Sequence, residues 1–221
     1  MAARLRYALP SGADRAVMMA WRQLCLSALF MMMSNTALAE RWVAYTIDPK
    51  ATRIRFHWTY MGMLSPAGQF SNAVGTIVCD LDKPDSARVD VRIPVRTLKT
   101  FMPLIDSTLL GSGDYFQPEQ YPIMRFRSTE IMHLDKEKRE FSLVGELTVN
   151  GISRPVILSA KVPTANQGNP LSSGALSATT SFRRSEFGMN KMLGVVGDEM
   201  RVILQVRAQE APLTLSEQPS L

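Results

Sequence analysis

Apolar and polar residues alternate with a period of two through most of the chain from Trp42 onward. In residues 53–60, for example, Ile54, Phe56 and Trp58 alternate with charged or polar neighbours. Strict alternation is typical of a β-strand with one buried face and one solvated face. The same pattern, or a shorter apolar run, recurs at residues 42–47, 70–80, 87–93, 124–130, 141–149, 152–162, 176–182 and 200–208. The pattern predicts eight or nine strands and an all-β domain.

The dipeptide Asn150-Gly151 joins two of these runs. Both residues accept the positive φ that the two central positions of a type I′ turn require. The dipeptide therefore predicts a tight hairpin between residues 141–149 and 152–162. Because side chains alternate between faces, Phe141, Leu143 and Leu147 are expected on one interior face.

Residues 98–116 interrupt the alternation. Leu104, Ile105, Thr108 and Leu109 follow a helical spacing, and Gly111-Ser112-Gly113 comes at the end of this spacing. One short helix across the mouth or the side of the sheet is expected here. Strands this numerous and evenly spaced indicate a closed barrel or a sandwich.

The first 39 residues have the order of a secretory signal peptide. Four arginines precede an apolar run from Leu24 to Met33, and Ala37-Leu38-Ala39 suits a signal peptidase. About ten apolar residues are too few to cross a bilayer. We therefore expect cleavage of residues 1–39, a mature chain that begins at Glu40, and a periplasmic or secreted location. A retained amphipathic anchor is the alternative, and Met18 or Met19 is an alternative start that gives a signal of ordinary length.

Removal of residues 1–39 changes the electrostatic picture. The whole chain has a formal charge of +5, but after residue 39 there remain 21 basic and 19 acidic residues. These charges are scattered singly rather than clustered, so no footprint for nucleic acid is present.

Catalytic and metal-binding patterns are sparse. The two histidines, His57 and His133, stand on a polar strand face and beside a charged turn, and they are far apart in sequence. With a single mature cysteine, Cys79, they do not form the set of three or four ligands that zinc requires. Cys79 lies in a strand-like run, so we interpret it as a buried thiol, with a reactive or dimer-linking thiol as the alternative. No G-x-S-x-G nucleophile motif occurs. The sequence predicts no catalytic residue, no metal site and no cofactor.

Short motifs in a fixed order cover the chain from Tyr45 to Ala208. They are Tyr45-Thr46-Ile47-Asp48-Pro49, Gly68-x-Phe70 with Gly75, Asp106 with Asp114-Tyr115-Phe116 and Tyr121-Pro122, Phe126-Arg127-Ser128-Thr129, the hairpin Val144-Gly145-Glu146-Leu147-Thr148-Val149-Asn150-Gly151-Ile152-Ser153-Arg154-Pro155-Val156, and Arg184-Ser185-Glu186-Phe187-Gly188-Met189. In this order they resemble the YceI family of lipocalin-like, polyisoprenoid-binding periplasmic proteins. The chain departs from the family at two places where a histidine is common, which here correspond to Tyr60 and to Ile105-Asp106-Ser107-Thr108-Leu109.

The resemblance implies an eight-stranded antiparallel lipocalin-like barrel with one short helix over residues 40–208, followed by a flexible tail at 209–221. It also implies that the barrel holds a long isoprenoid chain. An eight-stranded barrel has room for its own side chains or for one small ligand. The candidate apolar interior consists of Ile54, Phe56, Trp58, Val89, Val91, Phe126, Leu143, Phe182 and Leu204.

The expected rim of this cavity lies at the Arg184 motif. Arg184 is the candidate partner of a phosphate or quinone oxygen, with Arg183 on the opposite strand face, and Phe116 and Phe187 are candidate walls. The alternative is that Arg184 pairs with Glu186 or Asp114 and locks the loop.

The function predicted is non-catalytic binding or transport of an isoprenoid or other amphiphilic lipid, such as a polyprenyl phosphate or an isoprenoid quinone. A homodimer and a transient membrane contact are compatible with that role. Three alternatives stay open at this level. They are a lipid-modifying enzyme that uses the same cavity, a barrel with a filled core, and an outer-membrane barrel with its apolar face turned outward.

Overall fold

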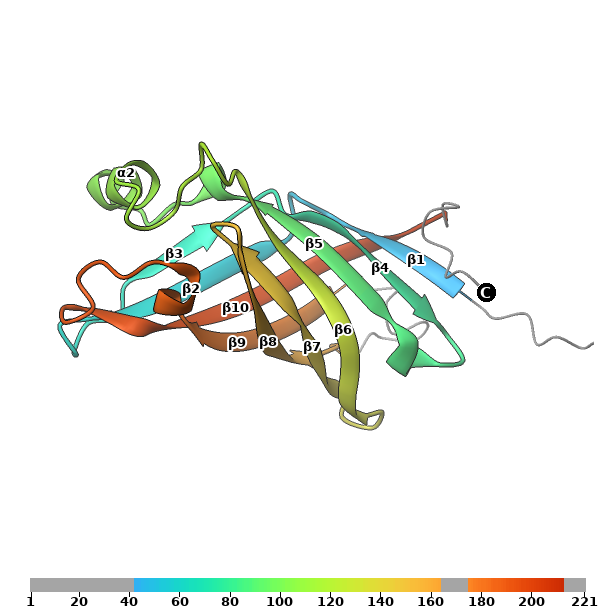
Figure 1. Ribbon diagram of the computed structural model, residues 1–221. Helices are drawn as coiled ribbons and strands as arrows, with labels where there is room; N and C mark the ends of the chain where they lie inside the picture. Colours follow the sequence, from blue (N-terminus) through green and yellow to red (C-terminus); the bar gives the residue numbers. More distant parts are fainter. Residues whose placement is uncertain (1–41, 164–174, 213–221) are drawn as a thin grey trace, which may run out of the picture. The chain divides into compact units, whose positions relative to one another are not determined.

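Antiparallel strands curl into one continuous sheet in the computed structural model, which describes residues 42–163 and 175–212 (Figure 1). The predicted signal peptide and most of the predicted tail lie outside these ranges. The strands are β1 (Trp42–Ile47), β2 (Arg53–Tyr60), β3 (Ala67–Phe70), β4 (Val74–Asp80), β5 (Arg88–Pro94), β6 (Ile123–Asp135), β7 (Glu140–Val149), β8 (Ile152–Lys161), β9 (Ala175–Arg183) and β10 (Val196–Ala211).

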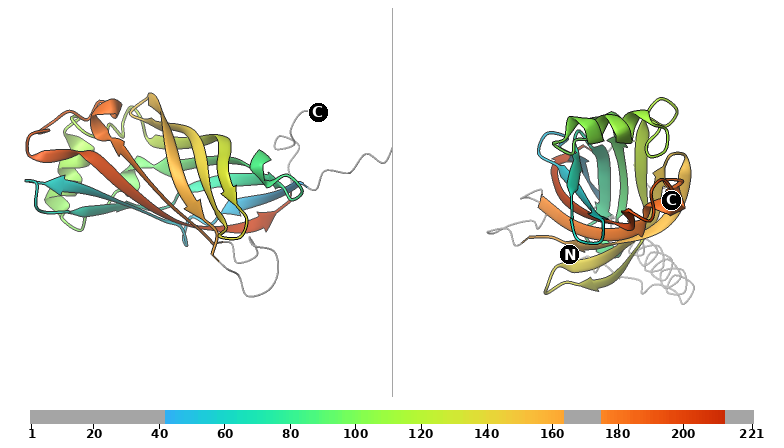
Figure 2. Two further views of the ribbon diagram at one scale, coloured as in Figure 1. Left: turned by 90° about the horizontal axis from the view of Figure 1, so that it is seen from below. Right: turned by 90° about the vertical axis from the view of Figure 1, so that its left-hand side faces the viewer.

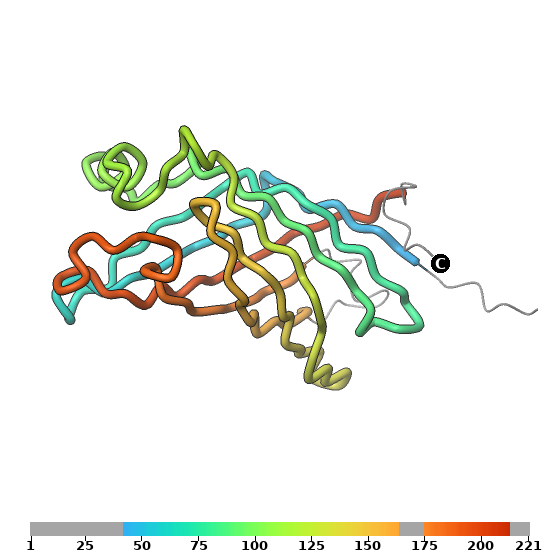
Figure 3. The backbone as a smooth tube through the Cα atoms, in the orientation of Figure 1, coloured from blue at the N-terminus to red at the C-terminus, as the bar shows by residue number. Residues whose placement is uncertain are grey.

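The sheet closes because β1 pairs with β4 on one edge and with β10 on the other. The closed ring β1-β4-β5-β6-β7-β8-β9-β10 contains eight strands, which confirms the predicted antiparallel barrel. The long strand β10 makes this possible: its first part pairs with β2, from Val196 to Gln205, and its last part pairs with β1 (Figure 3). The strand pair β2–β3 therefore continues the wall of the barrel beyond β1 and β4.

Several predicted strand limits are wrong. β6 runs to Asp135 rather than to residue 130, and β10 begins at Val196 rather than at residue 200. The run at residues 70–80 is broken between β3 and β4. The Thr97 hydroxyl group bonds to both the N–H and the carbonyl group of Ser71, and the next residue, Asn72, turns the chain with a φ of 57°. The barrel also extends past residue 208, because β10 runs to Ala211 and pairs there with Ala44 of β1.

The Asn150-Gly151 hairpin is confirmed. Val149 pairs with Ile152, and the two turn residues have φ values of 51° and 74°. The Asn150 side chain also fastens the turn to a neighbouring segment, because its Nδ2 atom donates a 2.6 Å hydrogen bond to the carbonyl oxygen of Tyr115.

One helix, α2 (Pro103–Gly111), occupies the interval where the alternation stops, as predicted. Three short 3-10 turns, η1 (Pro84–Ser86), η2 (Val95–Thr97) and η3 (Arg184–Phe187), complete the described elements. The Asp106 carboxylate accepts 2.6 Å hydrogen bonds from the N–H and the hydroxyl group of Thr100, which fixes the start of the helix. The right-hand view of Figure 2 looks into the barrel from the end at which α2 lies, with α2 at the top of the opening.

Apolar stripes of the strands face the interior of the barrel. On β2, for example, Ile54, Phe56 and Trp58 are buried, whereas Arg53 and Arg55 are exposed. This is the reverse of the arrangement in an outer-membrane barrel, whose apolar face points outward. Among the described residues, no helix is both long enough and apolar enough to cross a membrane.

We predict that Gly151→Val lowers the free energy of unfolding by at least about 2 kcal/mol. A β-branched residue resists the positive φ of Gly151, and a Cβ atom there would lie 2.5 Å from the Tyr121 ring. Gly194→Val is the matched control, since a Cβ atom at Gly194 would meet no heavy atom within 4 Å. Thermal unfolding of both variants checks this, and equal melting temperatures would contradict it.

Cys79 packs in a cluster with Tyr45, Ile77 and Ala208, and burial is the main reason that its thiol pKa is raised. The thiol therefore stays protonated at pH 8, where an exposed cysteine is partly ionised. We predict that a thiol reagent at pH 8 labels Cys79 at least tenfold more slowly in the folded protein than in urea. Equal labelling rates in the two states would show that the thiol is accessible.

Candidate functional site

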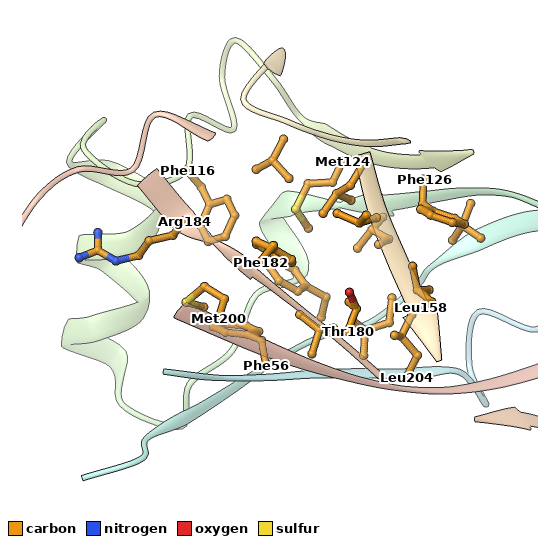
Figure 4. Close-up of a pocket in the computed structure, with 18 of the residues that line it drawn as sticks. Phe56, Phe116, Met124, Phe126, Leu158, Thr180, Phe182, Arg184, Met200 and Leu204 are labelled. Carbon is orange, nitrogen blue, oxygen red and sulfur yellow. The ribbon is translucent and has the colours of Figure 1, made fainter. Parts of the chain in front are cut away.

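A cavity of about 600 Å³ occupies the interior of the barrel (Figure 4). Sites for small molecules commonly span about 300–1,000 Å³. The interior is therefore not filled by the inward side chains, and the filled-core alternative is wrong. Two lining residues, Leu104 of α2 and Met192 of the loop between η3 and β10, are 80% and 50% exposed. The mouth of the cavity therefore lies at the end of the barrel that carries α2.

All nine residues predicted for the apolar interior line this cavity. Their strands bring them together because every second side chain of a strand points to the same face. On β2 the rings of Phe56 and Trp58 stack with their centroids 5.7 Å apart. The Phe56 ring lies over Gly68 of β3, where a Cβ atom would be 2.3 Å from it. The glycine in the Gly68-x-Phe70 motif thus makes room for an aromatic side chain of the cavity wall.

Several lining residues were not among the predicted site residues. Leu104, Ile105, Thr108 and Leu109 of α2 line the cavity, so the helix forms part of its wall rather than only covering the sheet. Their helical spacing was visible in the sequence, but spacing does not show which side of a barrel a helix covers. Further lining residues from the mouth and the wall are Tyr60, Tyr115, Met124, Met189, Met192 and Met200.

Polar groups are few in the cavity wall. Among the described residues, the polar lining side chains are Thr52, Tyr60, Thr108, Tyr115, Thr180 and Arg184. All three threonine hydroxyl groups donate to backbone carbonyl oxygens, Thr52 to Arg207 at 3.3 Å, and Thr108 to Leu104 and Thr180 to Ile157 at 2.8 Å. The lining in this part of the chain includes no carboxylate, imidazole, thiol or amine side chain. Within residues 42–163 and 175–212, no three His, Cys, Asp or Glu side chains gather as a metal site would need.

Arg184 is buried at 3% exposure, and its guanidinium points away from the apolar side chains of the cavity (Figure 4). It donates four hydrogen bonds to backbone carbonyl oxygens. Nε bonds to Gly197 at 3.0 Å, Nη1 to Met189 at 2.6 Å, and Nη2 to Lys191 at 2.9 Å and to Val196 at 2.8 Å. These bonds occupy four of the five N–H groups of an arginine.

The environment of Arg184 explains how a charge is tolerated there. Its Cζ atom lies 5.9 Å from the centroid of the Tyr115 ring, which adds a cation–π contact. Burial lowers the pKa of the guanidinium, which stays charged at neutral pH because an arginine starts from a pKa above about 12. The alternative pairing of Arg184 with Glu186 or Asp114 is wrong. Arg184 holds the loop through carbonyl oxygens, and Asp114 lies 3.5 Å from the Nζ atom of Lys191.

The two phenylalanines predicted at the rim have different positions. Phe116 lines the cavity and contacts Phe70 edge to face, with ring centroids 5.6 Å apart. Phe187 is completely buried and is absent from the cavity lining. It packs edge to face against Phe182, a lining residue, at 5.2 Å and so supports the wall from behind.

A closed antiparallel barrel with an apolar interior cavity is the architecture of the lipocalin-like binding barrels. Comparison with known proteins identifies the family within this class. The model of the YceI-like domain matches residues 45–208, and the chain therefore belongs to the YceI family.

Related sequences and structures agree with this assignment. A UPF0312 protein of Photorhabdus laumondii is 33% identical over 134 residues, which cover 60% of this chain and 66% of that protein. A UPF0312 protein of Yersinia enterocolitica is 27% identical over 85% of this chain and 95% of its own length.

Solved structures share the fold at low sequence identity. BcnA of Burkholderia cenocepacia superposes with a TM-score of 0.62 at 18% identity, over 75% of this chain and 99% of that one. A polyisoprenoid binding domain from Saccharophagus degradans superposes with a TM-score of 0.53 at 11% identity, over 77% of this chain and 99% of that one.

We predict that Arg184→Ala lowers the free energy of unfolding by about 3 kcal/mol or more, because it leaves buried carbonyl groups without donors. Arg183→Ala is the matched control. Arg183 is exposed at the end of β9, and its removal should change stability by less than about 0.5 kcal/mol. Urea unfolding of both variants provides the measurement. If Arg184→Ala kept full stability and lost affinity only for pyrophosphate-bearing lipids, Arg184 would instead be a head-group ligand.

Proposed function

We propose that this protein binds an isoprenoid or another long-chain lipid in the barrel interior and carries it without catalysing a reaction. The observation that carries the proposal is the cavity, which is about 600 Å³ in volume and almost entirely aliphatic and aromatic. Apolar burial contributes about 25 cal/mol per Å², so a chain of several prenyl units binds without polar contacts. The solved relative whose name includes polyisoprenoid binding supports this ligand class.

The size of the cavity limits the part of the ligand that is enclosed. At about 30 Å³ for a water-sized group, it has room for roughly twenty carbon atoms. That is about four isoprene units, and a longer chain would extend through the mouth.

We further propose that the head group is uncharged, which favours an isoprenoid quinone over a polyprenyl phosphate. Arg184 is the cation in the described lining, and four of its N–H groups already donate hydrogen bonds to backbone carbonyl groups. A phosphate in the cavity would lose water without gaining a partner of opposite charge, which is strongly unfavourable. Hydroxyl groups such as those of Tyr60 and Tyr115 suit a quinone oxygen.

Binding without catalysis accounts for the side chains present. A lipid-modifying enzyme needs a nucleophile, a general acid or base, or a metal at the cavity. The described lining offers hydroxyl groups and one guanidinium that is already hydrogen-bonded. The expected location is the periplasm, after cleavage behind Ala39, and N-terminal sequencing of the exported protein tests it.

Native mass spectrometry with lipid extraction is the direct test. We expect the purified protein to carry a prenyl lipid, and the delipidated protein to bind a tetraprenyl benzoquinone at least tenfold more tightly than tetraprenyl pyrophosphate. Tighter binding of the pyrophosphate would contradict the uncharged head group. Absence of any prenyl lipid, together with no binding of either probe, would remove the proposal.

A cavity-filling substitution separates interior binding from binding at the surface. Ala178 of β9 lines the cavity, whereas its neighbour Thr179 is exposed on the outer face. Ala178→Phe should weaken binding of the tetraprenyl quinone at least tenfold, because each buried CH₂ group contributes about 0.8 kcal/mol. Thr179→Phe, the matched control, should leave the affinity unchanged. Equal affinities of the two variants would place the ligand outside the barrel.

A further inference from the structure

Three uncharged turns at the mouth of the barrel expose large apolar side chains. They are residues 61–64 between β2 and β3, residues 101–104 at the start of α2, and residues 192–195 before β10. We call their exposed side chains the apolar rim, which consists of Met61, Met63, Leu64, Phe101, Met102, Leu104, Met192, Leu193 and Val195. Five further large hydrophobic residues of the described chain are exposed, and they lie scattered over other elements.

The first and third turns are in direct contact, and the second turn borders the same cavity through Leu104. The N–H group of Met61 donates to the carbonyl oxygen of Val195 at 2.8 Å. Asp114, in the segment that follows α2, forms an ion pair with Lys191, the residue before the third turn. In Figure 1 all three turns are at the left-hand end of the barrel, the second with α2 at the top and the other two below it.

The rim is continuous with the cavity. Leu104 and Met192 belong to both, since each is at least half exposed and each also lines the interior. An apolar surface therefore runs without interruption from the outside of the barrel to its interior.

Each turn also holds one bulky side chain in an unfavourable backbone conformation. Met61, Phe101 and Met192 have φ values of 52°, 64° and 55°. Positive φ is unusual for large residues, and such strain tends to be kept where function requires it. At Met61 the turn itself requires this conformation, since Gly62 beside it has a φ of 70°, yet a large apolar residue rather than Asn or Gly occupies the position.

Charges beside the rim neutralise one another. Lys99 lies 3.8 Å from Asp106, and Lys191 lies 3.5 Å from Asp114. The three turns themselves carry no charge. The surface therefore fits hydrocarbon and has no strong preference for an anionic or a cationic partner.

We propose that the apolar rim docks the mouth of the barrel onto a lipid bilayer, so that an isoprenoid chain moves between membrane and cavity without crossing water. The transfer of an isoprenoid chain rests on the proposed function, whereas the docking itself does not. A second copy of the chain fits this surface less well. The best-packed part of a protein interface is its centre, and here the centre is the open mouth. Fluid acyl chains can cover the rim without a packed centre.

Vesicle flotation with the purified, delipidated protein tests the docking. We expect the protein to float with phosphatidylcholine vesicles and equally with vesicles that contain phosphatidylglycerol. The fraction that floats should change little between about 0.1 and 1 M salt. The test variant is Met63→Ser/Phe101→Asn/Leu193→Ser, with one change in each turn and none in the cavity lining. Asparagine replaces Phe101 because it tolerates positive φ. The vesicle partition coefficient should fall at least tenfold.

The matched control is Leu81→Ser/Ile157→Ser/Leu134→Ser, which removes exposed apolar side chains away from the mouth. It should partition like the unmodified protein. Failure of the unmodified protein to float, or an equal loss in the control, would overturn the proposal. A dimer in sedimentation experiments that the rim variant dissociates, without any flotation, would assign the surface to a second copy instead.

Transfer kinetics separate this proposal from the proposed function. The rim variant should bind the tetraprenyl quinone with unchanged affinity in vesicle-free solution. It should move that lipid between donor and acceptor vesicles at least tenfold more slowly. Flotation without any prenyl binding would refute the proposed function and retain the docking, whereas unchanged flotation and transfer in the rim variant would refute the docking alone.

Discussion

The pairing of β10 with strands on both of its edges is the constraint on which the rest of the structure depends. One edge of this strand pairs with β9, and the other pairs first with β2 and then with β1. Closure directs every second side chain of each strand into a common interior, although β8 pairs with β9 only at Ser159, Ala160 and Lys161. The cavity, its mouth and the position of α2 all follow from that closure.

A closed ring of eight strands determines how much space lies inside, and the side chains determine whether that space stays open. Here bulky aromatic residues pack on one another along the wall, as Phe56 does with Trp58 and Phe70. Small residues such as Ala160 and Ala178 face the interior elsewhere. The difference between large and small side chains on the inner face leaves a cavity of ligand size rather than a solid core.

The only guanidinium in the described lining shows how a charge near an apolar site can serve structure alone. Arg184 holds the loop between β9 and β10 by bonding to carbonyl groups of residues 189–197. That loop includes Met192, which contributes to both the mouth and the exposed rim. The residue that we expected to meet a head group thus positions apolar side chains at the entrance, and the chemistry left for the ligand is that of hydrocarbon and hydroxyl groups.

The sequence by itself determined the local features of this protein. Alternation identified most of the strands, though not β3, and grouped the nine residues of the predicted apolar stripe, while Asn150-Gly151 identified the hairpin, because side-chain period and turn chemistry depend on neighbouring residues. Alternation placed these nine residues on one apolar face but did not show whether that face points into or out of the barrel, and the sequence did not show that α2 lines the cavity or that Arg184 bonds to carbonyl groups. Those features depend on atoms far apart in sequence, such as Arg184 with Gly197 or Phe70 with Phe116. Only the tertiary structure decided them, because closure of the sheet is what brings such groups within contact distance.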